Sequence, residues 1–442
     1  MEMNWSQRLE EGLVFTLPLM VMDATMTKST NTVKATDLQA PVNQLFHAMA
    51  LADAKFTDVV TPNVDTIYSQ AFLDLSLDGV IIDFPKTDRF CTVEVLDAWT
   101  NCICVLDATR FEAEQVSFLF TGPGFAGEVP RGMGEIKSPT PMVWVLIRTL
   151  CGGPDDMAQV RAIQSQMDAY TLTQYRDGTK AVKPEGSFDP AKEFIPVRRV
   201  MGMSLEEYFT QANALMAKNP PAPEDAPMLE KLAEIGVGPG LTFDRGVFGD
   251  QGEQLWLKVK VGLMDVDRSL ARAASYLVQS GGWLYFGRPI AEFGTAYFYR
   301  AVIALVGFGA NPVSIAVYPK TDRDAQGGRL HGANRYVLHF EKDGLPPVKD
   351  FGFWSVTAYD SATNLLIDNP LDRYCINDRS EVSCNEDGSL DILIQQEAPP
   401  EGAQANWLPV NADQFHLVMR IYLPEESVLA NEWKTPVILP VK

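Results

Sequence analysis

The chain has 442 residues, of which 46% are hydrophobic and 21% charged, and its formal net charge at pH 7 is −20. This composition is typical of a globular protein and excludes a largely disordered one, while the length predicts two or three domains. An acidic chain without a run of Lys or Arg repels phosphate backbones. We therefore expect no nucleic-acid partner and attribute the charge to solubility.

The cysteines and the N-terminus give no sign of export. The six cysteines lack the CxxC spacing of a zinc site and are few for a disulfide scaffold, so we expect buried free thiols in a reducing compartment. The apolar run at 12–22 follows two acids and has no basic segment or cleavage site, which favours a buried N-terminal helix, or a helix and a strand, over a signal peptide. No membrane span is predicted. The chain as given is expected to be cytoplasmic.

The first third of the chain is expected to be mainly β. Residues 43–53 (NQLFHAMALAD) have the spacing of a short helix. After them, β-branched and aromatic runs broken by turns predict a series of strands, at 67–75, 80–84, 90–96, 103–106 and 142–149. Short strands without intervening helices favour a sandwich or a barrel.

The rest of the chain changes pattern twice. Residues 155 to about 300 have helical periodicity, and strand-like alternation returns at 335–340, 353–359, 390–396 and 415–423. In the last run, His416, Arg420 and Tyr422 would lie on the face opposite the core. We therefore predict an α+β chain, mainly β, in which two β-sandwich or jelly-roll-like domains (1–150, with an N-terminal helix, and 309–442) are joined by a helical segment (151–308).

The stretch 61–101 holds the best candidates for a functional site. In its opening turn, PNVDT, Asp65 would act as a general base and Tyr68 as an acid, with Asn63 and Thr66 orienting a polar substrate. The alternative is that Asp65 caps the turn by accepting backbone N–H groups.

The same stretch ends in DAWTN. Asp97 and Asn101 would bind a hydroxylated ligand stacked on Trp99, or would simply end a strand. Because strand ends that converge on one mouth often hold ligands, we expect both ends of the stretch to line one pocket.

A comparison of two stretches of the chain weakens the case for a functional role of the DAWTN residues. Residues 90–101 and 353–364 share a pattern of Phe, Val, Asp, Thr and Asn at equal spacing, so the two β domains are either duplicates or alike by chance. A repeated pattern makes Asp97 and Asn101 architectural. The functional hypothesis then narrows to the PNVDT turn.

Motifs for metals and common catalysts are weak or missing. Asp322, Asp324, Gln326 and Gly327 open like a calcium loop, but Ala333 stands where the bidentate Glu is needed, so a polar turn is favoured. HExxH, GxSxG and the kinase motifs do not occur, and no GxGxxG follows a predicted strand. We expect no metal and no other cofactor.

Several motifs together resemble a known family. TPNVDTIYSQAFLDLS, LDAWTN, GPGFAGEVP and the strand end at Ile147, Arg148 and Thr149 resemble the N-terminal module of the bacterial paired domains of unknown function numbered twelve-fifty-four and twelve-fourteen. The C-terminal module is matched by FWSVTAYD, NPLDRYCI, EDGSLDILIQ, NWLP and FHLVMRIYLPEESVL.

The resemblance implies β-sandwich or jelly-roll modules with helical additions, often oligomeric and often exported, and it transfers no activity. Arg148, in a matched motif, is a candidate substrate-binding residue or a structural ion pair.

These observations favour a protein that binds or converts a small polar or hydroxylated molecule in the N-terminal β domain. If it is an enzyme, hydrolase- or lyase-type acid–base chemistry fits the residues best. We expect a homo-oligomer with a small-molecule ligand. Two alternatives remain open: a structural assembly of tandem jelly rolls, and a calcium-stabilised carbohydrate-binding module.

Overall fold

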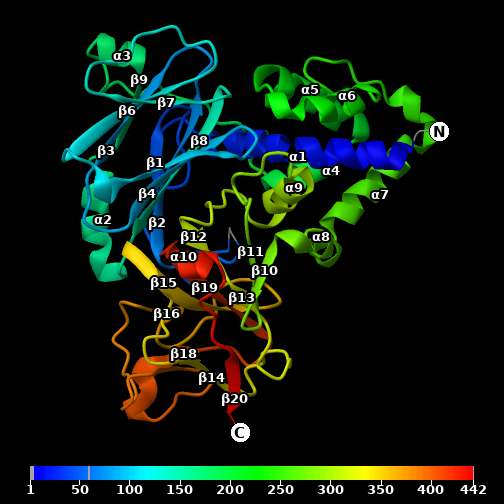
Figure 1. Cartoon of the computed structure of the whole chain (residues 1–442). Coiled ribbons are helices and arrows are strands. Elements are labelled where there is room, and N and C mark those ends of the chain that lie inside the picture. The colour runs from blue at the N-terminus through cyan, green and yellow to red at the C-terminus, as the bar shows by residue number, and fades with distance from the viewer. Residues whose placement is uncertain (1–3, 58–59, 442) are drawn as a thin grey trace.

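A computed structural model describes residues 4–57 and 60–441. Helices make up 30% of the chain and strands 27%, so the predicted α+β class is confirmed, although strands do not predominate as expected. Figure 1 shows three parts: an N-terminal group of strands, a layer of helices beside it, and a C-terminal group of strands below.

Two sheets form the N-terminal β part. A five-stranded sheet has the order β1-β2-β8-β4-β5, and a four-stranded sheet has the order β7-β6-β3-β9. They face each other across a core that includes Val93, Val143 and Ile82. The strands are β1 (Leu45–His47), β2 (Thr66–Asp74), β3 (Val80–Pro85), β4 (Cys91–Asp97), β5 (Cys102–Asp107), β6 (Gln115–Thr121), β7 (Gly134–Lys137), β8 (Met142–Leu150) and β9 (Asp168–Thr171). The short helices α2 (Met157–Gln164) and α3 (Leu172–Arg176) flank β9.

The outer face of the five-stranded sheet is covered by helices. Successive side chains of a strand point to opposite faces, so Val93 and Val95 of β4 enter the core between the sheets while Leu96 packs against the helical layer. Glu94 and Thr92 lie on the same side as Leu96. This alternation decides which residues can meet the rest of the chain.

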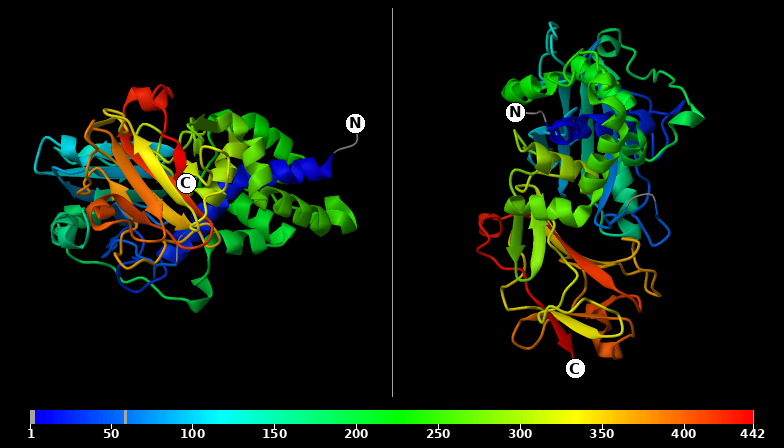
Figure 2. Two further views of the ribbon diagram at one scale, coloured as in Figure 1. Left: turned by 90° about the horizontal axis from the view of Figure 1, so that it is seen from below. Right: turned by 90° about the vertical axis from the view of Figure 1, so that its right-hand side faces the viewer.

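Helix α1 is the centre of the helical layer. It starts after Asn4, whose side-chain oxygen accepts from the N–H of Gln7, and its middle is fully buried. The predicted buried N-terminal helix is therefore confirmed. Figure 2 shows the helices gathered on one side of the molecule with α1 among them. The helices are α1 (Trp5–Ser29), α4 (Pro196–Gly202), α5 (Leu205–Lys218), α6 (Ala226–Ala233), α7 (Gly252–Met264), α8 (Val266–Arg272) and α9 (Tyr297–Val306).

The C-terminal part again has two facing sheets. The larger has the order β10-β11-β13-β19-β15-β16, with β12 also paired to β19, and the smaller has the order β18-β17-β14-β20. Its elements are β10 (Leu277–Ser280), β11 (Trp283–Phe286), β12 (Ala316–Val317), β13 (Lys320–Thr321), β14 (Arg335–Phe340), β15 (Val348–Asp360), β16 (Cys375–Asn377), β17 (Leu390–Gln395), β18 (Trp407–Pro409), β19 (Phe415–Pro424), α10 (Glu426–Leu429) and β20 (Ile438–Val441).

Strand β19 confirms the predicted alternation of core-facing and outward-facing side chains. Phe415, Leu417 and Met419 lie in the core between the two C-terminal sheets, as expected. Arg420 and Tyr422 lie on the other face, toward the N-terminal part.

Some local predictions are wrong. Residues 43–53 do not form a helix, because Leu45–His47 pairs as an edge strand with Ala71–Ser69 of β2. Strands β6 and β7 were not predicted. All six cysteines are free, as predicted, but only Cys91 and Cys151 are buried, since Cys102, Cys104 and Cys375 are half-buried and Cys384 is exposed. Among the described residues, no helix combines the length and apolar character needed to cross a bilayer.

Removing a large buried side chain from the middle of α1 should destabilise the fold. Phe15 is fully buried, with its ring centroid 5.1 Å from that of Trp99 and 5.3 Å from that of Tyr297. Phe15→Ala is expected to lower the free energy of unfolding by about 3–5 kcal/mol, because it removes buried area and leaves a cavity. Urea titration followed by tryptophan fluorescence measures this. Phe188, which is 55% exposed, supplies the control: Phe188→Ala should change stability by less than about 0.5 kcal/mol.

Candidate functional site

The PNVDT turn lies at the junction of the two β parts. Asn63 shapes it, since its side-chain oxygen accepts from the N–H groups of Asp65 at 2.7 Å and Thr66 at 3.3 Å. The capping role that the sequence analysis offered for Asp65 thus belongs to Asn63. This leaves the Asp65 carboxylate to point across the junction.

Asp65 holds the C-terminal part. Its carboxylate is buried, accepts from the hydroxyl of Ser355 on β15 at 2.5 Å and pairs with Arg379 at 3.1 Å. The turn's carbonyls are also held: Tyr359 donates to the carbonyl of Pro62 at 2.6 Å, and Arg420 to that of Thr61 at 3.2 Å. Both carboxylate oxygens of Asp65 and the carbonyls of Thr61 and Pro62 are therefore already bonded to residues of the C-terminal part.

The other side of the turn leads to a group of tyrosines. The side-chain amide of Asn63 donates to Thr66 Oγ1 at 3.0 Å, to Tyr68 Oη at 3.4 Å and to Tyr422 Oη at 2.7 Å. Tyr422 lies 6.1 Å, centroid to centroid, from the ring of Tyr318. Two tyrosines from the C-terminal part therefore complete a cluster begun by Tyr68.

Arg148 lies at the centre of this cluster. The residue is 4% exposed, and its guanidinium donates to Glu94 Oε2 at 2.6 Å, to Asn311 Oδ1 at 2.8 Å and to the carbonyl of Gly309 at 2.6 Å. It also lies 5.7 Å from the ring centroid of Tyr68. Because Arg148 already has three acceptors, it is a residue that positions others rather than a free anion-binding group.

Glu94 is the unusual group of the site. It is fully buried in β4, and although Oε2 bonds Arg148, Oε1 has no hydrogen-bond partner among the described residues. Burial raises the pKa of Glu94 from 4.5 to about 7, against the charge of Arg148, which lowers it. Glu94 was not among the predicted site residues, although an acid inside the apolar run FCTVEVL is a signal of a functional position.

The tyrosines offer donors to match this free acceptor. Asn311 donates to Tyr318 Oη at 2.8 Å, as Asn63 does to the other two hydroxyls. Burial raises the pKa of Tyr318 and of Tyr422, so both stay protonated near neutral pH. Within the described residues, none of the three hydroxyls donates to a protein acceptor. The cluster thus presents one free carboxylate oxygen and three free hydroxyl protons.

The second predicted cluster lies elsewhere. Because β2 and β4 run in the same direction beside β8, Thr66 lies opposite Leu150 at one end of the sheet and Asp97 lies opposite Val143 at the other. The two ends of the 61–101 stretch therefore do not line one pocket.

The DAWTN turn has internal contacts of its own. Asp97 accepts from the N–H groups of Trp99 and Asn101, both at 2.8 Å, and burial raises its pKa to about 6. Trp99 is 3% exposed and packs on Phe15, so it is not free to stack on a ligand. The matching C-terminal turn shares one of these bonds, since Asp360 accepts from the N–H of Ala362 at 3.0 Å.

Access to the cluster is narrow. Asn63, Tyr68 and Tyr318 are partly exposed, while Glu94 and Arg148 are buried behind them. A hollow of about 180 Å³ next to Arg148's partner Gly309 runs toward Thr100, but its walls are too close to admit a water-sized sphere. A ligand would have to displace side chains to reach Glu94.

The described residues contain no group of three or more His, Cys, Asp or Glu side chains arranged to hold a metal ion. In the loop that resembles a calcium site, Asp324 Oδ1 accepts from the N–H groups of Gln326 at 2.8 Å and Gly328 at 2.9 Å. These bonds are those of a tight polar turn.

Each of the two β parts matches a family model. Residues 42–171 match DUF1254 and residues 315–426 match DUF1214, each described as a protein of unknown function. The chain belongs to the DUF1254 and DUF1214 families. The junction described above thus lies between a DUF1254 domain, which supplies Glu94 and Arg148, and a DUF1214 domain, which supplies Tyr318 and Tyr422.

Solved structures extend the comparison to the fold of the whole chain. The crystal structure of VPA0106 from Vibrio parahaemolyticus covers 99% of this chain and 100% of its own, with a TM-score of 0.73 and 20% sequence identity. An uncharacterised protein from Burkholderia cenocepacia is more distant, at 12% identity and a TM-score of 0.48 over 98% of this chain and 88% of its own. No curated protein matches the chain.

The raised pKa of Glu94 makes stability depend on pH. Glu94 holds its proton up to about pH 7 in the folded state, whereas the unfolded chain releases it near pH 4.5. The contribution of Glu94 to the free energy of unfolding is therefore fully present below pH 4.5 and is lost as the pH rises through 7. Relative to Glu94→Gln, the wild type should lose at most about 3 kcal/mol between these pH values.

Urea titrations at a series of pH values measure the difference. Glu112 is exposed, and Glu112→Gln should follow the wild-type profile. Parallel wild-type and Glu94→Gln profiles would contradict the pKa assigned to Glu94.

Breaking the contact across the junction should also cost stability. Asp65→Asn removes the charge that pairs with Arg379 and weakens the bond from Ser355, with an expected loss of about 1.5–3 kcal/mol. Asp413 is exposed, and Asp413→Asn serves as the matched control in the same denaturation experiment. Equal stability of both variants would show that Asp65 does not hold the junction.

Proposed function

We propose that this protein binds or converts a small hydroxylated molecule at the DUF1254–DUF1214 junction, with Glu94 as the group that exchanges a proton. The observation that carries the proposal is the unpartnered Oε1 of Glu94 in a fully buried site. A buried acceptor without a partner is costly, and such groups concentrate where a ligand supplies the missing bond.

The chemistry follows from the free atoms. A carboxyl group whose pKa is about 7 both accepts and donates a proton at neutral pH, as general acid–base catalysis requires. A hydroxylated ligand would donate to Glu94 Oε1 and accept from Tyr68, Tyr318 or Tyr422. Hydrolysis or elimination fits this set, and neither needs a cofactor from the chain.

The role first considered for Asp65 moves to Glu94 in this proposal. Asp65 accepts from Ser355 on one oxygen and from Arg379 on the other, so both oxygens are occupied by protein donors. Tyr68 keeps its place as a hydroxyl donor, with Asn63 and Arg148 as positioning residues and Thr66 supporting Asn63. Asp97, Trp99 and Asn101 have no part in it.

The architecture suits such a site. We class each pair of facing sheets as a β-sandwich-like domain, and the junction of two such domains brings residues from both to one place. The jelly-roll assembly and the calcium-stabilised carbohydrate module remain alternatives that no contact described above favours.

A ligand screen tests the proposal. Thermal unfolding of the wild type, Glu94→Gln and Glu112→Gln would be followed with polyols, sugars, hydroxy acids and amino alcohols added one at a time. A true ligand at 100 times its Kd stabilises by about 2.7 kcal/mol, which raises the melting temperature of the wild type and Glu112→Gln. Glu94→Gln should remain folded and lose the shift. A ligand that stabilises Glu94→Gln equally, or no stabilising compound among these classes, would contradict the proposal.

A further inference from the structure

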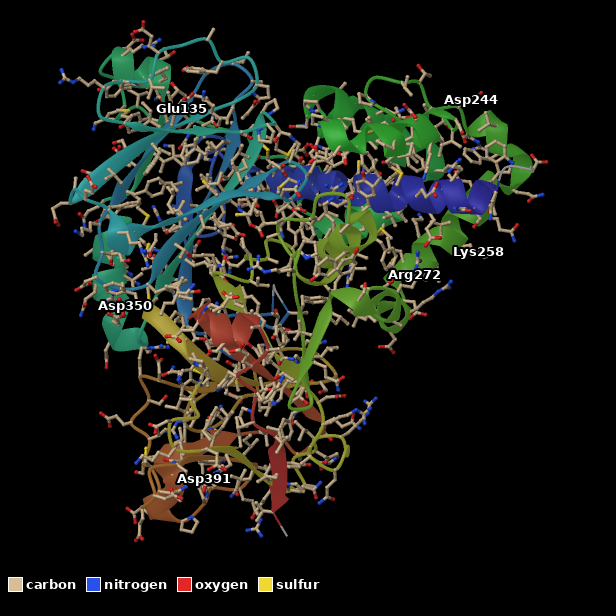
Figure 3. The ribbon with its side chains drawn as sticks, viewed as in Figure 1. Glu135, Asp244, Lys258, Arg272, Asp350 and Asp391 are labelled. Atoms are coloured by element: carbon tan, nitrogen blue, oxygen red, sulfur yellow. The ribbon has the colours of Figure 1, made fainter. Side chains whose placement is uncertain are left out.

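An unpartnered apolar stripe lies on the outer face of α7. Leu257, Val261 and Met264 are 59%, 60% and 53% exposed. Leu257 and Val261 line, with Gln254, a shallow surface groove of about 480 Å³, and Met264 continues the stripe beyond it. Figure 3 shows Lys258, which borders the stripe, at the outer side of the helical layer. The opposite face of α7 packs into the core of the helical layer, where Trp256 and Leu263 are buried.

The spacing of the stripe is that of a helix–helix seam. Gln254, Leu257, Val261 and Met264 are separated by three, four and three residues, which is the a/d pattern of a coiled coil. A surface helix that packs only against the core of its own chain has one apolar face, whereas α7 has a second apolar face toward solvent. Large apolar side chains gathered in this way mark an interaction surface.

The charges beside the stripe identify the partner. Lys258 and Asp265 are both exposed, carry opposite charges and lie seven residues apart, so they occupy the same heptad position. When two identical helices pack antiparallel, equivalent edges of the seam face each other. Lys258 of one copy then meets Asp265 of the other, and the two-fold axis repeats the pair.

Local geometry leaves room for this contact. Gly262 lies in the groove and presents no side chain, and the one side chain near it, that of Arg268, is long and exposed, so it can move aside for a second helix. Asp265 caps α8 through one oxygen, which accepts from the N–H of Arg268 at 3.1 Å, and its other oxygen stays free. The long-range repulsion between two chains of charge −20 is screened within about 8 Å at physiological salt.

We propose that α7 is the homodimer interface of this protein, in which the stripe Gln254, Leu257, Val261 and Met264 packs against the same stripe of a second copy. The ion pairs between Lys258 and Asp265 set the antiparallel orientation. This surface is separate from the Glu94 site, so the two proposals stand or fall independently.

Sedimentation velocity of the full chain over a range of micromolar concentrations tests the interface. The wild type is expected to sediment as a dimer. Val261→Glu, which places a charge in the seam, should give a monomer, and Lys258→Glu, which places two acids together, should raise the dissociation constant about tenfold or more.

Matched controls separate the interface from general effects. Val182 is also 60% exposed but lies outside α7, so Val182→Glu should remain dimeric. Lys86 is exposed and forms no salt bridge with any described residue, and Lys86→Glu changes the net charge as Lys258→Glu does while leaving the dissociation constant unchanged. Circular dichroism should show that all four variants are folded. A monomeric wild type, a Val261→Glu dimer, or equal effects of the α7 variants and their controls would overturn the proposal.

Discussion

The burial of the Arg148 guanidinium is the constraint on which the junction of the two domains depends. A charge of this kind cannot remain unpaired away from water without a cost of several kcal/mol, so acceptors must converge on it. Glu94 comes from the neighbouring strand of the same sheet, whereas Gly309 and Asn311 come from the segment that enters the DUF1214 domain. Satisfying one side chain therefore fixes the path of the chain between the domains.

The same requirement creates the candidate site. Asn311, once held by Arg148, holds Tyr318, and Asn63 holds Tyr422 from the other side. These residues lie far apart in the sequence, and the site forms only when both domains have folded and docked. Glu94 spends one oxygen on Arg148 and keeps the other free. A carboxyl group that accepts a hydrogen bond from a buried guanidinium thus also keeps an oxygen available for proton exchange.

The sequence predicted what local pattern determines. Alternation located β2, β4, β8 and β19, and it placed Arg420 and Tyr422 on the correct face of β19. The sequence pattern failed at Leu45–His47. These residues have the spacing of a helix, but they form an edge strand because they pair with β2. Among the candidate residues, Asn63, Thr66, Tyr68 and Arg148 meet at the junction, while Asp97 lies at the far end of the sheet. Such separation depends on strand direction and pairing, which single-strand patterns do not contain. Glu94 was within reach, because an acid in a strand buried on both faces needs an explanation.

The central claim is that Glu94 titrates near neutral pH in the folded protein. Carbon-13 NMR of the glutamate side-chain carboxyls, in wild type and Glu94→Gln, measures this without any ligand. We predict one carboxyl signal that titrates near pH 7 in the wild type and is missing from the variant. Identical titrations of the two proteins, with every glutamate changing near its usual pKa of about 4.3, would contradict the account.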